Sequence, residues 1–228
     1  MTSSKKQRQR KAIEEQETEV DLSTGQNEFS VVTALKDSTI FINFIVVLVC
    51  FSVVSFNYYM ISFYLKYVGG NIFINTLSST VSEWIGNFAA GGIQRWLGTK
   101  KGFIIWFAAS VVFALPLLFT ENEYLIMVSV FSSKFFVEGA FWLAYYVNPE
   151  VFPPLFVPFS FSVWGLLARI VTIAAPQIAE VKPRQVPVII FMVFSGVSTL
   201  AALFLRKSKY TPVQQDEEVK DYKSDKSD

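Results

Sequence analysis

The sequence predicts an all-α membrane protein with six transmembrane helices. Residues 41–65, 72–93, 103–119, 124–147, 158–179 and 186–205 form six apolar stretches. A helix needs about 20 apolar residues to cross the ~30 Å hydrocarbon core of a bilayer, and only the third stretch is short. Lipid offers no partner to backbone N–H and C=O groups, so a spanning segment must be a helix or part of a closed barrel. Because the stretches lack the alternating pattern of barrel strands, we expect helices.

The composition agrees with this class and excludes others. Hydrophobic residues make up 52% of the chain and charged residues only 17%, and the charges gather at the ends and in short loops. The net charge of +1 gives no basic field, so we expect no nucleic-acid partner. The chain has no histidine, which removes imidazole metal sites and His-based catalysis. The single cysteine, Cys50, has no partner for an intrachain disulfide. We therefore expect no enzyme, no cofactor and no metal.

The two ends of the chain differ from the middle. Residues 1–36 and 208–228 are polar and charged, so we predict a disordered cytosolic leader and tail around a six-helix bundle at 37–207. The first apolar stretch begins late, behind acidic residues that include Glu14 and Glu17, which is atypical of cleaved signal and transit peptides. We interpret it as a retained transmembrane helix.

The distribution of Lys and Arg predicts the orientation, because basic residues favour the cytosolic side. Two basic residues, Lys134 and Arg169, lie within the apolar stretches. On one side of the membrane, the predicted loops carry only three basic residues, Lys66, Lys182 and Arg184. The other side carries fifteen: Lys5, Lys6, Arg8, Arg10, Lys11, Lys36, Arg95, Lys100, Lys101, Arg206, Lys207, Lys209, Lys220, Lys223 and Lys226. Both termini are predicted to be cytosolic, and the even number of spans agrees because it places the two termini on the same side of the membrane.

Polar residues form stripes along the first two stretches. One stripe contains Ser52, Ser55, Tyr59 and Ser62, and the other contains Asn71, Asn75, Ser79 and Ser82. Their spacing places each set on one helix face. Hydrogen bonding and packing between helices would explain the serines. For Tyr59 and Asn75, a polar cavity is an equal alternative.

Four ionisable residues fall in the apolar region: Glu83, Lys134, Glu138 and Arg169. An unpaired charge near the bilayer centre costs at least ~2.5 kcal/mol, so we expect all four to face the bundle interior. Lys134 and Glu138 are four residues apart, share a helix face and are able to pair. Two interpretations stay open, a structural ion pair or a site for an ionic solute or coupling proton. In the fifth stretch, Pro176 predicts a bend.

Several motifs follow one another in a recognisable order. They are NYYMISFYLKYVGGNIFIN at 57–75, Glu83, the basic loop at 91–101, Lys134, YYVNPEVFPP at 145–154, and the pairs Ala168-Arg169 and Ala175-Pro176. Over residues 41–207 this order resembles the C-terminal half of a major facilitator superfamily transporter, in the branch of organic cation and anion transporters. The sequence departs from the family at the cytoplasmic turn, where Arg95 and Trp96 replace Asp-Arg, and at Val157, where the family has Arg.

The resemblance implies a multi-pass protein of the plasma membrane or an internal membrane, with the lipid bilayer as a partner. It implies transport of a small organic ion by alternating access, between this half and a second six-helix half, either another copy or a separate chain. The substrate-binding residues would be Tyr59, Asn75, Glu83, Lys134, Glu138 and Arg169. Two alternatives remain: a non-transporting structural subunit of a larger membrane complex, favoured by the departures, and a truncated twelve-helix transporter.

Overall fold

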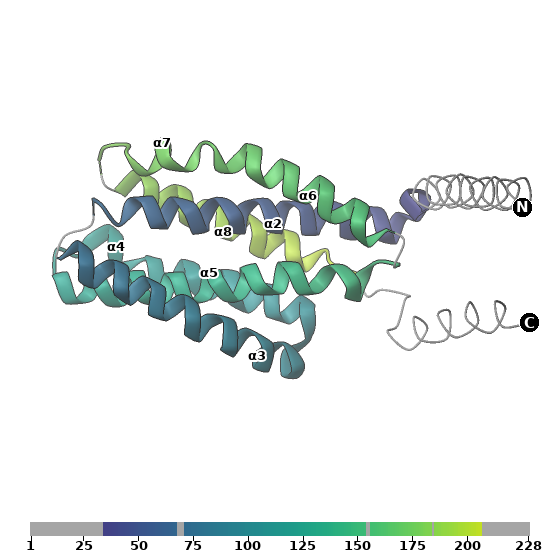
Figure 1. Ribbon diagram of the computed structural model, residues 1–228, viewed down its shortest axis with the longest axis horizontal. Coiled ribbons are helices and arrows are strands. Elements are labelled where there is room, and N and C mark those ends of the chain that lie inside the picture. The colour runs from purple at the N-terminus through teal and green to yellow at the C-terminus, as the bar shows by residue number, and fades with distance from the viewer. Residues whose placement is uncertain (1–33, 68–70, 154–155, 184, 207–228) are drawn as a thin grey trace, which may run out of the picture.

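The computed structural model describes residues 34–67, 71–153, 156–183 and 185–206, and these residues form helices joined by short connections (Figure 1). The predicted leader lies outside the described residues except for residues 34–36, and the predicted tail lies outside them entirely. In chain order the helices are α2 (Ser38–Tyr64), α3 (Ile72–Ala114), α4 (Pro116–Phe119), α5 (Glu123–Val151), α6 (Val157–Thr172), α7 (Ala175–Ala179) and α8 (Gln185–Leu203). The described part of the chain contains no strand, so the predicted all-α class is confirmed.

Five helical segments of the described chain are long and apolar enough to cross a membrane. They are Ser38–Tyr64, Ile72–Phe119, Glu123–Val151, Val157–Ala179 and Gln185–Leu203. The protein is therefore a multi-pass integral membrane protein. The number five differs from the predicted six because Ile72–Phe119 contains both the second and the third apolar stretch.

The helices begin where the sequence supplies capping side chains. Asp37 accepts a hydrogen bond from the backbone N–H of Thr39 at the start of α2, over 2.8 Å. Asn71 and Asn122 cap α3 and α5 in the same way, over 2.9 and 3.0 Å. Each cap satisfies one of the backbone donors that the first turn of a helix leaves free.

Helix α3 is two arms joined at Gly98. This glycine has φ 71° and ψ 167°, a conformation that favours glycine. A straight helix of 43 residues would be ~65 Å long, twice the thickness of the hydrocarbon core. Instead the chain turns back on itself within α3 (Figure 1).

Contacts with α5 show the direction of each arm of α3. Glu83 bonds Lys134 in the first arm, and Asn87 bonds Glu138, so both helices advance together. In the second arm, Gly102 lies against Leu143, and Trp106 lies against Gly139, so the numbering runs the opposite way. The first arm is thus parallel to α5 and the second antiparallel to it.

The predicted bend at Pro176 coincides with a break in the helix. Helix α6 ends at Thr172 and α7 begins at Ala175, with Pro176 in the first turn of α7. A proline fits the first turn of a helix because its missing N–H would have no partner there.

Aromatic side chains fill the core between α2, α5 and α6. The indole of Trp164 is fully buried and lies within 5.6–6.4 Å, between ring centroids, of Phe44, Phe51 and Phe152. Ring pairs at such separations add about 0.5–1.5 kcal/mol each beyond the burial of area. The outer surface of α3 is also apolar, with Trp84 72% exposed and Phe88 75% exposed. The outward apolar faces suit lipid or another bundle, whereas Lys134 and Glu138 on α5 are buried.

Candidate functional site

A buried ion pair lies between α5 and the first arm of α3. The Nζ atom of Lys134 is 2.8 Å from Oε1 of Glu83. The Lys134 side chain is fully buried, whereas that of Glu83 is 24% exposed. An ammonium group of this kind is stable in the interior only with a counter-charge and further hydrogen bonds.

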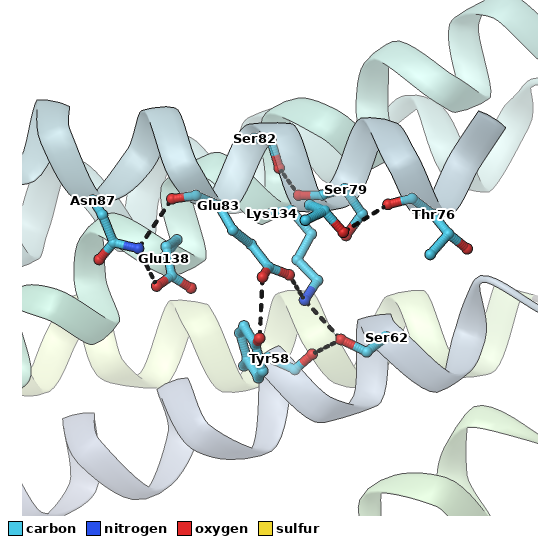
Figure 2. Close-up of polar contacts among 10 residues, drawn as sticks. Tyr58, Ser62, Thr76, Ser79, Ser82, Glu83, Asn87, Lys134 and Glu138 are labelled. Carbon is cyan, nitrogen blue, oxygen red and sulfur yellow. Dashed lines mark hydrogen bonds and ion pairs between the residues drawn. The ribbon is translucent and has the colours of Figure 1, made fainter. Parts of the chain in front are cut away.

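Helix α2 supplies those further contacts (Figure 2). Lys134 donates a hydrogen bond over 2.7 Å to the hydroxyl of Ser62, which in turn donates to the carbonyl of Tyr58. The Tyr58 hydroxyl donates to Oε2 of Glu83 over 3.2 Å. The Tyr58 ring also faces the ammonium, with Nζ 3.7 Å from the ring centroid, a cation–π contact. The pair therefore joins three helices.

A second carboxyl group lies one turn further along the same two helices. Asn87 donates a hydrogen bond over 2.9 Å to Oε1 of Glu138 and another to the carbonyl of Glu83. Glu138 is 9% exposed, and its second oxygen, Oε2, is buried without a hydrogen-bond partner in the structure. Figure 2 shows the Glu138 side chain of α5 beside Asn87, and the Glu83 side chain of α3 beside Lys134.

The cluster lies at the middle depth of its helices. Glu83 is about 11 residues from the start of α3, and Lys134 is about 11 residues from the start of α5, ~16 Å in each case. Half of a ~30 Å hydrocarbon core is about the same distance. Two carboxyl groups and one ammonium share this space, so full ionisation would leave a net charge of −1.

Sequence reasoning placed three of these side chains correctly in the bundle interior, Glu83, Lys134 and Glu138. It suggested a pair between Lys134 and Glu138, whereas the structure pairs Lys134 with Glu83. The i, i+4 spacing puts Lys134 and Glu138 on one face of α5, but Glu83 on the facing helix α3 approaches the Lys134 ammonium more directly.

The other three predicted site residues lie outside the cluster. Asn75 is buried, two turns before Glu83 on α3. Tyr59 is 45% exposed. Arg169 is exposed on α6, and within the described residues its side chain makes no ion pair, so the expectation that it faces the bundle interior is wrong for this bundle.

Tyr58 is the residue that sequence reasoning missed. The predicted polar stripe on α2 includes Tyr59, because Tyr59 is four residues after Ser55. Tyr58 is three residues after Ser55 and four before Ser62, so it fits the same face equally well. A choice between two adjacent tyrosines needs the position of the neighbouring helix.

A separate polar network holds the turn of α3. Thr99 donates a hydrogen bond to the Glu150 carboxylate, and Gln94 lies between them, 2.6 Å from the Thr99 hydroxyl. Lys100 donates to the carbonyls of Leu203 and Leu205, over 2.6 and 3.0 Å. This network ties the turn to the ends of α5 and α8 and is remote from the charged cluster.

Comparison with known proteins finds relatives for part of the chain. No protein-family model matches the chain. The chain is 29% identical over 136 residues to the Caenorhabditis elegans protein described as "Putative transporter svop-1", a match that covers 58% of this chain and 26% of that protein. It is 27% identical over 138 residues to the synaptic vesicle 2-related protein of Bos taurus and 28% identical to that of Xenopus laevis. Both matches cover 60% of this chain and 25% of the relative.

The matched region spans about a quarter of the length of these relatives. Of these relatives, the protein of Caenorhabditis elegans is described as a transporter. The similarity does not distinguish the branch of organic cation and anion transporters or the C-terminal half.

Proposed function

We propose that this chain forms a six-helix half of a major facilitator-type transporter, corresponding to the C-terminal half in the organic cation and anion branch, and that it moves a small organic ion by alternating access. The observation that carries the proposal is the charged cluster of Glu83, Lys134 and Glu138, buried at the middle depth of the bundle. Ionisable groups at this depth are costly, and they commonly mark solute and ion pathways. Solute sites in transporters of this kind lie at the same depth.

The charged cluster is partly accessible at one end. Glu83 keeps 24% of its side chain exposed, so one end of the ion pair is reachable from outside the bundle. Its partners come from α2 and α5, and a solute ion that replaced one partner would change the attraction between those helices. Such a change biases one arrangement of the bundle over another, which alternating access requires.

We also propose six membrane crossings with both termini cytosolic. The reversal at Gly98 divides Ile72–Phe119 into two spans, and it places Arg95, Lys100 and Lys101 in one turn. Basic residues favour the cytosolic side. In a Cys50→Ala background, cysteines introduced at positions 5 and 101 should label from the same side, and a cysteine at 182 from the opposite side. Labelling of 101 and 182 from one side would contradict this topology.

The surface of α6 and α7 supports a second six-helix unit, either another copy or a separate chain. Arg169 lies about 12 residues into Val157–Ala179, ~18 Å along the segment, and it is exposed. Only 17% of the apolar window of this segment is buried in the bundle. A guanidinium facing lipid at that depth would cost at least ~2.5 kcal/mol, and another bundle against this face would remove the cost.

A non-transporting structural subunit is the second candidate. The specific observation in its favour is that the Lys134 ammonium already has a carboxylate, a hydroxyl and an aromatic ring as partners. A buried charge with so complete a set of partners is also what a pair that only holds helices together would show.

Uptake by proteoliposomes tests the proposal. The full chain is reconstituted alone and with a candidate second half, with tetraethylammonium and benzoate as the cationic and anionic probes. The double variant Glu83→Gln/Lys134→Met removes both charges and retains side-chain volume, so it should fold but lose uptake. Lys182→Met, which removes an exposed charge, is the matched control and should retain uptake. No uptake under any pairing would support the structural role instead, and uptake by a demonstrated monomer would refute the need for a second unit.

A further inference from the structure

The turn of α3 around Gly98 is exposed and basic. Trp96 is 90% exposed, and Arg95, Lys100 and Lys101 are exposed close to it in the chain. Residues 95–101 include no acidic residue. Where the family that the sequence resembles has Asp-Arg, this chain has Arg95 and Trp96, so the exposed indole and the loss of the acid are features of this chain.

Two contacts hold this turn against the rest of the bundle. Lys100 donates hydrogen bonds to two carbonyls at the C-terminal end of α8, over 2.6 and 3.0 Å. Thr99 donates to the carboxylate of Glu150, close to the end of α5. The side chains of Arg95 and Lys101 form no hydrogen bond or ion pair with another described residue. The turn is therefore fixed to two helices, while two of its cations remain available to an external partner.

Further basic side chains lie at the same end of the bundle. Asn43 of α2 exchanges two hydrogen bonds with the backbone of Arg206, over 2.8 and 3.0 Å, so the start of α2, the end of α8 and the turn of α3 are neighbours (Figure 1). The exposed basic residues of this end, within the described ranges, are Lys36, Arg95, Lys100, Lys101 and Arg206. Its two described acidic residues, Asp37 and Glu150, both accept hydrogen bonds. The described part of this end thus carries a net charge of +3.

The other end of the bundle has the opposite balance. Its charged residues within the described ranges are Lys66, Glu121, Glu123, Glu180 and Lys182, which give a net charge of −1. A chain with this distribution attracts anions to the end that carries the turn of α3.

A membrane surface is the partner that suits this turn. Both arms of α3 belong to the apolar segment Ile72–Phe119, so the turn between them lies where apolar helix gives way to polar surroundings. Indole side chains are enriched at membrane–water interfaces, because the ring is apolar and its N–H is polar. Each basic side chain beside an anionic membrane strengthens binding by about fivefold.

We propose that the turn of α3 is a binding site for anionic phospholipid, with Trp96 at the depth of the headgroups and with Arg95 and Lys101 on the lipid phosphate. The inference goes beyond the proposed transport function, because it concerns the surface of the bundle and not the charged cluster. Arg206 follows the carbonyl that Lys100 binds and adds to the attraction. A lipid bound here holds the turn and, through Thr99 and Lys100, the ends of α5 and α8.

Quenching of tryptophan fluorescence in vesicles tests this site. The full chain is reconstituted in phosphatidylcholine that contains either phosphatidylglycerol or phosphatidylcholine with bromine on the acyl carbons near the headgroup. Each sample is measured with and without Trp96→Phe, so the difference isolates Trp96 from the other tryptophans. Trp96 should be quenched more by the anionic lipid than by the zwitterionic lipid, and high salt should reduce this preference.

Two matched double variants separate a site from general attraction. Arg95→Gln/Lys101→Gln should lower the preference for the anionic lipid at least about fivefold. Lys66→Gln/Lys182→Gln removes two exposed cations from the other end and should retain the wild-type preference. All four positions are exposed, so both variants should fold, and the salt dependence of the wild type gives a readout that needs neither variant.

Three results would overturn the proposal. Equal quenching of wild-type Trp96 by the two lipids would show no preference, and an equal loss in both double variants would show general attraction without a site. Displacement of the brominated anionic lipid by soluble glycerol phosphate would show that a free phosphate compound is the ligand. The measurement requires no transport, so absence of uptake would leave its outcome unchanged.

Discussion

Substitutions of Glu83 and Lys134 should have non-additive effects on the free energy of unfolding, because the two side chains form a buried ion pair. Loss of the Glu83 charge should cost more than loss of the Lys134 charge. Glu83→Gln leaves the fully buried Lys134 ammonium with the Ser62 hydroxyl and the Tyr58 ring but without its ion-pair partner. Removal of one partner from a buried pair costs about 3–5 kcal/mol. Because the amide of Gln still accepts a hydrogen bond, we expect the lower end, ~3 kcal/mol.

Lys134→Met should be less harmful. The Glu83 carboxylate that remains is 24% exposed and keeps the hydrogen bond from Tyr58. Partial solvation reduces the cost to ~1.5 kcal/mol. The double variant removes both charges of the pair, and replacement of both members of a buried pair by apolar or neutral groups is often nearly neutral, so it should cost ~1.5 kcal/mol or less. The coupling free energy is then ~3 kcal/mol.

Unfolding by dodecyl sulfate in mixed micelles, followed by tryptophan fluorescence, measures these free energies. Ser162→Ala is the control, because the Ser162 hydroxyl is exposed and, among the described residues, bonds a carbonyl of its own helix alone. Additivity of the two single variants to within ~0.5 kcal/mol would refute a direct interaction. A larger cost for Lys134→Met than for Glu83→Gln would refute the argument that the ammonium is the more buried charge.

Two further comparisons use matched positions. A Cβ atom at Gly139 would lie 2.5 Å from the Trp106 ring, so Gly139→Ala should destabilise the chain by ~1–3 kcal/mol in the same assay. Gly165 has no heavy atom within 4 Å of the same position, so Gly165→Ala should be neutral or stabilise the helix by up to ~1 kcal/mol, and equal effects would contradict the packing. Tyr58→Phe should cost ~1 kcal/mol through the lost bond to Glu83, and Tyr59→Phe, at an exposed position, less than ~0.5 kcal/mol, with the reverse order as the contrary result.

The sequence by itself determined the class of the protein and the positions of its helices. Apolar stretches of bilayer length leave the backbone no alternative to helices, because lipid cannot satisfy free peptide groups. The helix break before Pro176 is a local effect of the proline, so it too followed from the sequence. The helical period also predicted that Lys134 and Glu138 share a face.

Only the tertiary structure decided which side chains meet. The period of a helix fixes which of its residues share a face, but the rotation of each helix against its neighbours decides what that face contacts. Packing of α3 against α5 gave Lys134 its partner in Glu83, and packing of α2 selected Tyr58 over Tyr59. The same rotations left Arg169 exposed on the outside of the bundle, and they left one buried oxygen of Glu138 without a hydrogen-bond partner among the described residues. Glu83 and Lys134 are 51 residues apart in the sequence, so only the fold brings them together.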